Sequence, residues 1–429
     1  MLSMKKGEFT GDSRLKVLIG EEIRIKITDL PPKHEVKIHT RRKDDKKQLW
    51  YSSASYISDN HGLVDSDKSE SISGSYTGVD PIGLFYSMET ISSDALPENL
   101  TILPSQDPEK IFFYFDVELD GEIVAFKYLE TVRMLPNVQY ESLEKEGLVA
   151  NFYHPEGENL PAVLVVSGSE GGIATPDIVA GILASKGYAA LALAFFEMPG
   201  LPEILEEIPL DYVEKAVQWL SNQPMVNPEK MVMIGTSKGA ELTLLSASLF
   251  PQIKGVVATS PSCTVFQGIN QDPEAEPHSS WTYKGKNLTF VPFVYNNDFL
   301  GQFASCYPEH LEFLPLYKAS FENETAVQEA AINVEKIQGP VLLISSDDDR
   351  VWPSKEMSER ITERLKSSEF PFKYEHLSFD GAGHLAGRPG YMPWPTPFYV
   401  KGGTPQINGN AQVKVWKAIL KFLEDTKND

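Results

Sequence analysis

Cysteines are scarce in this chain of 429 residues. Only Cys263 and Cys306 occur, and neither lies in a CxxC or Cys/His spacing. Two such cysteines exclude a disulfide framework, and their spacing predicts neither a metal site nor a bound cofactor. Because a chain without a disulfide framework is typical of a reducing compartment, we expect a cytoplasmic protein.

Positive charge is also in short supply. The 39 Lys and Arg residues are outnumbered by 60 Asp and Glu residues, which gives a formal net charge of -21. A protein that binds the phosphate backbone needs clustered Lys and Arg, so we expect no nucleic-acid partner. The densest basic run, Arg41–Lys43 with Lys46 and Lys47, is interrupted by Asp44 and Asp45. Such a run is typical of a solvated loop, with a weak anion contact as the alternative.

Long hydrophobic runs are missing as well. No stretch approaches about 18 uninterrupted apolar residues, so we expect no stable membrane insertion. The first residues, MLSMKKGEFTGDS, lack the apolar segment of a signal peptide, and the last, EDTKND, lack a peroxisomal tripeptide. These patterns agree with a cytoplasmic location, and they predict no particular oligomeric state.

A chain of this length usually forms more than one hydrophobic core. Residues 8–135 alternate apolar and polar positions with period two or form short aromatic and β-branched runs. The clusters DLPPKH, SDNHG, SISGS and ELDGE predict turns between these runs. Strands without a convincing amphipathic helix are typical of a small antiparallel β-sandwich, which we predict over residues 1–138.

The pattern changes near residue 145. Apolar runs that predict strands lie at 162–168, 188–195, 255–262, 340–349 and 374–379. Helical spacing alternates with them at 177–187, 211–223, 240–250 and 412–425. Continuous apolar strands that alternate with helices are typical of a mostly parallel sheet covered on both faces. We therefore predict a doubly wound α/β domain over residues 139–429.

One segment of this second domain does not fit the alternation. Residues 262–332 lie between two predicted strands and are far too long for an ordinary strand–helix connection. They are rich in aromatic residues and proline, and part of a helix is predicted at 321–332. We interpret this segment as a cap over an active site, and the alternative is a surface insertion without a role.

A five-residue motif in the second domain carries the strongest chemical signal. Gly235-Thr236-Ser237-Lys238-Gly239 follows the apolar residues MVMI and precedes the helical residues AELTLLSASLF. A G-x-S-x-G motif between a strand and a helix is typical of the nucleophile elbow of α/β-hydrolases. Its glycines leave room for a serine at a strained backbone angle. We predict that Ser237 is a nucleophile, with a tight Gly-Ser turn as the alternative.

A serine nucleophile needs a base and an acid, which follow it along the chain in this fold. The acid is expected after a late strand, where the apolar run ends in Asp347-Asp348-Asp349. We choose Asp349, with Asp348 as the competitor, and expect the unused carboxylates to cap the next helix. The base is expected after the last strand, where SFDGAGHLAG places His384 behind two glycines.

The reaction also needs two donors for the negative charge on the substrate oxygen. One predicted donor is the backbone amide of Lys238, which follows the nucleophile. The other is expected in the loop SGSEGG, where the amide of Ser169 is the first choice and that of Glu170 the second. The alternative is that the glycines of this loop only let strand and helix pack closely.

Longer blocks of sequence carry a family resemblance. The N-terminal part contains LWYSSASYISDNHGLVDSD at 49–67 and GSYTGVDPIGLFYSM at 74–88, and ordinary α/β-hydrolases lack the second block. The C-terminal part contains SGSEGG, LASKGYAALALAFFEMPGLPE, GTSKGAELTLLSAS, DDDRVWPS and GAGHL. On these blocks, the chain resembles the acyl-CoA thioesterase and bile acid-CoA:amino acid N-acyltransferase family over nearly its whole length.

The resemblance implies a sandwich domain and a hydrolase domain that cleaves acyl-CoA, with Ser237, Asp349 and His384 as nucleophile, acid and base. It favours Asp349, because the acid of the family lies three residues before a tryptophan, here Trp352. Members that transfer acyl groups to amino acids have Cys at the elbow, so Ser237 favours hydrolysis through an acyl-enzyme to free acid and CoA. The alternatives are an esterase or peptidase acting on a non-CoA substrate, and acyl transfer to an amine.

Overall fold

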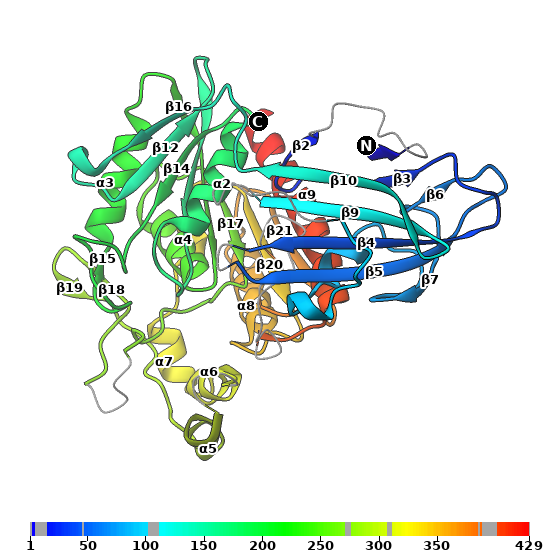
Figure 1. Cartoon of the computed structure of the whole chain (residues 1–429). Helices are drawn as coiled ribbons and strands as arrows, with labels where there is room; N and C mark the ends of the chain where they lie inside the picture. The colour runs from blue at the N-terminus through cyan, green and yellow to red at the C-terminus, as the bar shows by residue number, and fades with distance from the viewer. Residues whose placement is uncertain are drawn as a thin grey trace. The chain divides into compact units, whose positions relative to one another are not determined.

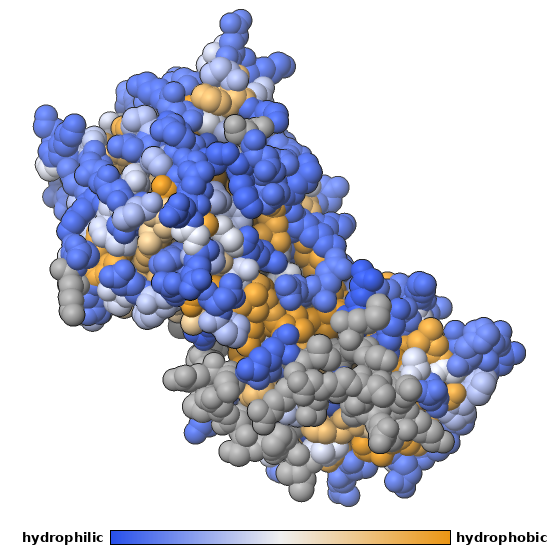
Figure 2. All heavy atoms as spheres, turned by 90° about the horizontal axis from the view of Figure 1, so that it is seen from above, coloured by the Kyte–Doolittle hydropathy of each residue, from blue (hydrophilic) through white to orange (hydrophobic). Residues whose placement is uncertain are grey.

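The computed structural model describes residues 2–4, 15–44, 47–101, 111–270, 276–306, 311–384, 387 and 401–428. The chain divides into two compact units, one from Met1 to Arg133 and one from Met134 to Arg388 with Pro397–Asp429 (Figure 1). Hydrophilic residues cover most of the coloured surface in Figure 2, in keeping with the net charge of -21. Within the described ranges, no helix has both the length and the apolar character that a membrane span requires.

The first unit is built almost entirely from strands. Its elements are β1 (Leu2–Met4), β2 (Leu15–Leu18), β3 (Ile25–Ile27), β4 (Glu35–Lys43), β5 (Leu49–Ile57), β6 (Val64–Asp65), β7 (Ser71–Gly74), α1 (Gly83–Tyr86), β8 (Glu89–Thr90), β9 (Ile111–Leu119) and β10 (Glu122–Val132). One sheet has the path β2-β10-β9-β4-β5-β7 with β8 beside β5, and another has the order β1-β3-β6. Most neighbouring strands are antiparallel, but β1 runs parallel to β3, and β2 runs parallel to β10. The predicted all-β N-terminal region is confirmed.

Alternating apolar side chains explain the core of this unit. Val36 and Ile38 of β4 and Phe113 and Phe115 of β9 are two residues apart and buried, as the two-residue period of a strand requires. Phe85 of α1 stands edge-on to Phe113, with ring centroids 5.2 Å apart. The block GSYTGVDPIGLFYSM therefore places a helical turn against the strands of this unit.

An eight-stranded sheet is the centre of the second unit. Its strands are β11 (Gln139–Ser142), β12 (Ala150–His154), β13 (Leu160–Val166), β14 (Ala189–Leu193), β16 (Val226–Thr236), β17 (Gly255–Thr259), β20 (Val341–Ser346) and β21 (Tyr374–Phe379). Their order is β11-β12-β14-β13-β16-β17-β20-β21. The strands from β14 to β21 in this order run parallel to one another, whereas β12 is antiparallel to both β14 and β11. Order and direction give the predicted α/β-hydrolase fold, which is confirmed.

Helices cover this sheet and bury its central strands. They are α2 (Ala174–Ala184), α3 (Leu210–Ser221), α4 (Lys238–Leu249), α8 (Ser354–Ser367) and α9 (Pro405–Asn428). Every residue of β14, β17 and β20 is buried, which explains why these strands are continuous apolar runs rather than alternating ones. The carboxyl ends of the parallel strands are the edge at which ligands bind in open α/β sheets.

The long segment between β17 and β20 folds into small elements. They are β18 (Trp281–Tyr283), β19 (Lys286–Asn287), α5 (Asn297–Cys306), α6 (Leu314–Phe321) and α7 (Glu324–Glu329). The short strand β15 (Ile208–Pro209), which lies just before α3 in the sequence, pairs with β18 of this segment. Helix α7 lies within the predicted range 321–332, whereas α5 and α6 were not predicted. Figure 1 shows α5, α6 and α7 grouped together, away from the strands of the central sheet.

Helices α2 and α9 begin well before the residues that their periodicity predicts. Helix α2 begins at Ala174 rather than at residue 177, and Pro176 lies in its first turn. Helix α9 begins at Pro405 rather than at residue 412. Proline is tolerated in a first helical turn because the N–H that it lacks has no partner within the helix there. Apolar spacing therefore locates the interiors of these helices better than their starts.

A matched pair of leucines tests the core of the second unit. Leu164 in β13 is fully buried, and Leu249 at the end of α4 is 39% exposed. We expect Leu164→Ala to lower the free energy of unfolding by about 2–5 kcal/mol, because it removes buried contacts and leaves a cavity. The control Leu249→Ala should cost less than about 1 kcal/mol. Urea denaturation of both variants measures the difference, and equal losses would contradict this description of the core.

Candidate active site

Ser237 occupies a strained turn between β16 and α4. Its backbone angles are φ 59° and ψ -124°, which few non-glycine residues adopt. A Cβ atom at Gly235 would lie 2.1 Å from the backbone oxygen of Gly239, and one at Gly239 would lie 2.0 Å from the oxygen of Ser167. The two glycines of the motif are therefore required by close backbone approach, as a nucleophile elbow predicts.

Backbone hydrogen bonds fix the position of this turn. The amide of Ser237 donates to the oxygen of Thr259 at the end of β17, at 2.9 Å. The oxygen of Ser237 accepts from the amides of Ala240 and Glu241, at 2.8 and 3.1 Å. Among the described residues, nothing accepts a hydrogen bond from the amide of Lys238. This first amide of α4 therefore remains available at the positive end of the helix.

His384 and Asp349 come together beyond the ends of β20 and β21. Nδ1 of His384 lies 2.9 and 2.8 Å from the two carboxylate oxygens of Asp349, and both side chains are buried. Asp349 Oδ1 also accepts from the amides of Val351 and Trp352, at 2.9 and 3.3 Å. The indole of Trp352 stands edge-on to the imidazole, with centroids 5.9 Å apart. The carboxylate thus holds the imidazole by Nδ1 and leaves Nε2 for other partners.

The competing acid, Asp348, is occupied elsewhere. Its Oδ2 accepts from the amide of Gly403 at 2.7 Å, and its Oδ1 accepts from Nε of Arg350 at 3.2 Å. A Cβ atom at Gly402 would lie 1.6 Å from the backbone oxygen of Asp348, so the two segments are in close contact. Asp348 therefore braces the segment around residue 402, and it is Asp349 that meets the imidazole.

The expectation that the unused carboxylates cap the next helix is wrong. Within the described part of the chain, no side chain caps the first turn of α8, which follows Pro353. Asp347 accepts from the amide of Gly381, in the loop before His384. These carboxylates bond to loops that are distant in the sequence, so spacing along the chain cannot reveal their partners.

A single strand end joins the elbow to the histidine loop. Thr259 accepts from the amide of Ser237, and the next residue, Ser260, donates its hydroxyl to the backbone oxygen of His384 at 2.7 Å. The amide of His384 donates to the oxygen of Lys401 at 2.8 Å, and Trp352 Nε1 donates to the oxygen of Ser260 at 3.1 Å. The end of β17 thus lies between the nucleophile candidate and the base candidate.

Among the described residues, no hydrogen bond joins Ser237 to His384, whereas His384 contacts Asp349 directly. Among the described residues, the Ser237 hydroxyl has no hydrogen-bond partner. Hydrogen bonds between a nucleophile and its base are often long in ligand-free sites and shorten when substrate binds. The structure therefore brings His384 and Asp349 into direct contact and places Ser237 just after β16, the strand beside β17.

The loop after β13 approaches the elbow from the other side. A Cβ atom at Gly168 would lie 2.9 Å from the oxygen of Thr236 and 3.4 Å from Cβ of Ser237. The carboxylate of Glu170 lies next to the same glycine, with Oε2 at 2.6 Å from that position. Ser169 is exposed, and no described residue accepts from its amide. The amides of Ser169 and Lys238, on segments that flank Ser237, thus both lack an acceptor among the described residues.

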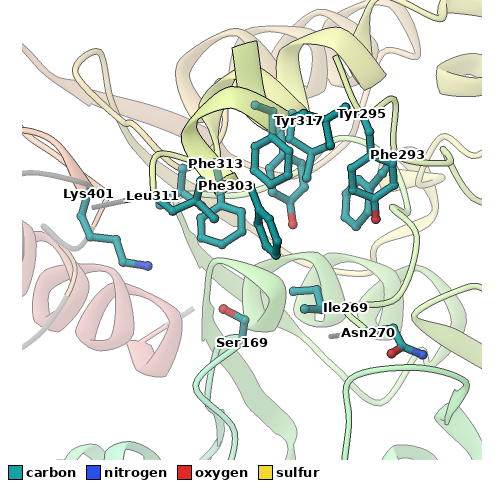
Figure 3. Close-up of a pocket in the computed structure, with 14 residues that line it drawn as sticks. Ser169, Ile269, Asn270, Phe293, Tyr295, Phe303, Leu311, Phe313, Tyr317 and Lys401 are labelled. Atoms are coloured by element: carbon teal, nitrogen blue, oxygen red, sulfur yellow. The ribbon is translucent and has the colours of Figure 1, made fainter. Parts of the chain in front are cut away.

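A pocket of about 250 Å³ lies between this loop and the segment of α5 and α6 (Figure 3). Its wall is mostly aromatic and aliphatic, and Ser169, Asn270 and Lys401 add polar atoms. The lining residues are Ser169, Ile269, Asn270, Phe293, Tyr295, Phe299, Leu300, Phe303, Leu311, Phe313, Leu316, Tyr317, Val351 and Lys401. Ser169 and Val351 connect the pocket to the loop beside the elbow and to the segment after Asp349.

A buried ion pair lies directly behind the elbow. Nζ of Lys238 is 2.7 Å from Oε1 of Glu241, and the two side chains are 1% and 0% exposed. The same oxygen accepts from the indole Nε1 of Trp281 at 2.7 Å, and Nζ lies 5.4 Å from the centroid of that ring. Because Trp281 belongs to β18, this cluster fastens the inserted segment to the helix that follows Ser237.

Burial and attraction act on this pair in opposite directions. Removal from water lowers the pKa of the Lys238 ammonium and raises the pKa of the Glu241 carboxyl. The attraction between the two groups opposes both changes, as does the hydrogen bond from Trp281 on the carboxylate. Each charge is tolerated in the interior only because the other is in contact with it.

Several of these residues escaped the sequence analysis. Lys238 was predicted only for its amide and Trp281 only as an aromatic residue of the cap segment, and Glu241 and Ser260 were given no role. Glu241 follows Lys238 by three residues, a spacing at which helical side chains meet, so that signal was present. Nothing in the sequence indicated the long-range contact with Trp281.

The described residues contain no group of side chains that could bind a metal ion. Among them, no group of three or more His, Cys, Asp or Glu side chains is arranged to hold a metal ion. The groups gathered around the elbow are a hydroxyl, an imidazole, a carboxylate and backbone amides. Those are the groups that nucleophilic acyl transfer requires.

Two family descriptions match the chain. "BAAT / Acyl-CoA thioester hydrolase C terminal" matches residues 208–429, and "Acyl-CoA thioester hydrolase/BAAT N-terminal region" matches residues 20–145. The peroxisomal succinyl-coenzyme A thioesterase of Mus musculus is 26% identical, covering 94% of this chain and 93% of its own. The bile acid-CoA:amino acid N-acyltransferase of Mus musculus is 28% identical and covers 96% of both chains.

A solved structure is also similar to this chain. A putative dienelactone hydrolase from Klebsiella pneumoniae is 15% identical, and the match covers 67% of this chain and 98% of that one, with a TM-score of 0.41. The fold assignment rests on the strand order and directions given above.

The buried pair behind the elbow gives a test of stability. We expect Glu241→Ala to lower the free energy of unfolding by about 3–5 kcal/mol, because it leaves the Lys238 ammonium buried without a partner. Replacing both groups, as Lys238→Met with Glu241→Leu, should recover most of this loss. Thermal and urea unfolding of the single and double variants measure the two effects.

The control is Glu229→Ala, which breaks an exposed pair with Lys254 and should change stability by less than about 1 kcal/mol. A double variant as unstable as Glu241→Ala would show that the cluster is held by something other than the balance of its two charges.

Proposed function

Because the chain belongs to the family of acyl-CoA thioester hydrolases and bile acid-CoA:amino acid N-acyltransferases, we propose that it hydrolyses acyl-CoA through an acyl-enzyme on Ser237. The observation that carries the proposal is the contact between His384 and Asp349, beside a serine in the backbone conformation of a nucleophile elbow. The proposed products are a free acid and CoA.

The first half of the proposed reaction transfers the acyl group to the protein. Ser237 Oγ attacks the thioester carbonyl carbon while its proton moves to Nε2 of His384. Asp349 holds Nδ1 and stabilises the imidazolium that forms. When the tetrahedral intermediate collapses, the C–S bond breaks and the CoA sulfur leaves with the proton from His384. The acyl group remains on Ser237 as an ester.

The second half restores the enzyme. Water attacks the ester carbonyl and gives a proton to His384, and collapse of the second tetrahedral intermediate returns that proton to Ser237 Oγ. In both intermediates the negative oxygen needs preset donors, and we assign this role to the amides of Lys238 and Ser169. The assignment is supported by the absence of a protein acceptor for either amide among the described residues.

The choice of acceptor is the finer part of the proposal. The matched relatives include thioesterases, which release the acid, and N-acyltransferases, which use an amine. The family resemblance associates Cys at the elbow with transfer, and this chain has Ser237 there. We therefore assign water as the acceptor and acyl-CoA as the substrate.

A role for the inserted segment and a cellular location are part of the same proposal. We assign residues 262–332 as a cap that binds the acyl group, which is supported by the pocket between this segment and the loop of Ser169. A domain boundary near residues 138 and 139 and a cytoplasmic location are proposed from the sequence. One relative is named as peroxisomal, so imaging of the tagged chain in cells tests the location.

Turnover of acyl-CoA tests the proposed function. We expect the purified protein to release free CoA thiol from acyl-CoA, and Ser237→Ala to lower kcat by about 10⁶ because the nucleophile is lost. A fluorophosphonate probe should label the wild type and spare Ser237→Ala.

Adding glycine should leave the acid as the main product if water is the acceptor. Cleavage of simple esters without turnover of any acyl-CoA, or an amide as the main product, would contradict the proposal.

The choice between neighbouring carboxylates gives a second test. We expect Asp349→Asn to lower kcat by about 10⁴, because the amide cannot hold the imidazole in the tautomer that accepts a proton at Nε2. Asp348→Asn is the matched control and should lower kcat by less than about 10-fold, since Asp348 contacts Gly403 and Arg350 rather than His384. Steady-state kinetics on one acyl-CoA measures both variants. A larger loss for Asp348→Asn would reverse the assignment.

A further inference from the structure

The pocket beside α6 is lined by a buried tyrosine whose hydroxyl has no hydrogen-bond partner among the described residues. Tyr317, on α6, is 4% exposed and lines the pocket. Among the described residues, none forms a hydrogen bond with its hydroxyl. Figure 3 shows the rings of Tyr317 and Tyr295 extending from the cap toward the side on which Ser169 and Ile269 lie. Polar groups of buried side chains usually have a hydrogen-bond partner, which a ligand in the pocket would supply for this hydroxyl.

Neighbouring rings hold Tyr317 in place. Its ring stands edge-on to Phe266, Phe293 and Trp352, with centroid distances of 5.0, 5.2 and 5.3 Å. Trp352 in turn contacts the imidazole of His384. A phenol packed on three sides cannot easily swing away to find a partner, so its hydroxyl is presented to whatever enters the pocket.

The chemistry of the hydroxyl is fixed by its surroundings. Burial and the nearby Glu241 carboxylate both raise the pKa of Tyr317 above its ordinary range, so the phenol stays protonated at neutral pH. A protonated phenol donates one hydrogen bond. In a mostly apolar pocket, a ligand without an acceptor leaves this donor unpaired, which is unfavourable.

The volume of the pocket indicates the size of the acyl group that fits within it. An apolar cavity of about 150 Å³ holds a single benzene ring. The present pocket has about 250 Å³, which is enough for one ring with a short tether or an acyl chain of similar bulk. Six aromatic side chains form much of its wall, and rings pack well edge-to-face against such walls.

We propose that the pocket selects compact acyl groups that carry a hydrogen-bond acceptor, such as a ring hydroxyl or a keto oxygen, and that the Tyr317 hydroxyl is the donor that recognises it. This inference rests on the proposed function and specifies its substrate class. Tyr317 is a specificity residue here, because it contacts the acyl group and takes no part in proton transfer.

A trapped water is the competing explanation. Oε2 of Glu241 is buried and has no hydrogen-bond partner among the described residues, and the charge of this carboxylate acts on Tyr317. A water that joins these two groups would satisfy both without any ligand. In that case, loss of the hydroxyl would affect stability and leave the preference among acyl groups unchanged.

Matched acyl-CoA pairs test the proposal. The pairs are 4-hydroxyphenylacetyl-CoA against phenylacetyl-CoA and 5-oxohexanoyl-CoA against hexanoyl-CoA, with palmitoyl-CoA as the bulky reference. We expect kcat/KM to favour the polar member of each pair by about 10-fold, because one hydrogen bond gives roughly that factor. Tyr317→Phe removes only the hydroxyl and should bring both ratios close to one.

The control variant is Tyr295→Phe, which removes a pocket phenol that is 36% exposed and can bond to water instead. It should keep most of the preference. Three results would overturn the proposal: unchanged ratios in Tyr317→Phe, an equal slowing of all acyl-CoA substrates in that variant, or hydrolysis of palmitoyl-CoA as efficient as that of the compact substrates.

Failure of the inference can be told from failure of the proposed function. If no acyl-CoA is hydrolysed, the same four compact acids are compared as nitrophenyl esters. If acyl-CoA is not hydrolysed but the esters show a preference that depends on Tyr317, the proposal of a CoA substrate is contradicted and the proposed role of Tyr317 is supported. If acyl-CoA is hydrolysed without that preference, the proposed function is supported and the proposed role of Tyr317 is contradicted.

Discussion

The strained backbone of Ser237 is the constraint on which the rest of the site depends. A serine at φ 59° and ψ -124° is stable only where its surroundings allow no other conformation. Three features provide this here: glycines at 235 and 239 that permit close backbone approach, the hydrogen bond from Ser237 to Thr259, and the first turn of α4. Together they fix Ser237 just after the end of β16, next to the Lys238 amide, which has no acceptor among the described residues.

The buried ion pair next to Ser237 positions neighbouring residues rather than adding stability. A buried ion pair rarely adds stability compared with apolar residues of similar size. Lys238 and Glu241 nevertheless occupy the first turn of α4, where they bind Trp281 of the inserted segment. Trp352 has a comparable role on the other side, since it contacts Tyr317, His384 and Ser260. The pocket wall and the candidate catalytic residues thus contact the same few buried side chains.

The site was predictable from the sequence where it depends on local pattern. Ser237 stands between an apolar strand and a helix, and Asp349 and His384 follow strands, so chain order was enough to choose these candidates, of which the structure brings His384 and Asp349 into contact. The helices α5 and α6 of the inserted segment have weaker patterns and were missed. The prediction that Asp347 and Asp348 cap the next helix was also wrong, because these side chains form tertiary contacts with Gly381 and Gly403. The Tyr317 environment depends on packing among distant segments, which no spacing along the chain encodes.

The central claim is that the acyl group passes through Ser237. Rapid-quench mass spectrometry of the protein mixed with acyl-CoA tests it most directly, because an ester intermediate adds the mass of the acyl group to the peptide that carries its nucleophile. The account predicts this added mass on the peptide containing Ser237, and its absence in Ser237→Ala. Turnover with no acyl group on that peptide, or with the acyl group on another residue, would contradict it.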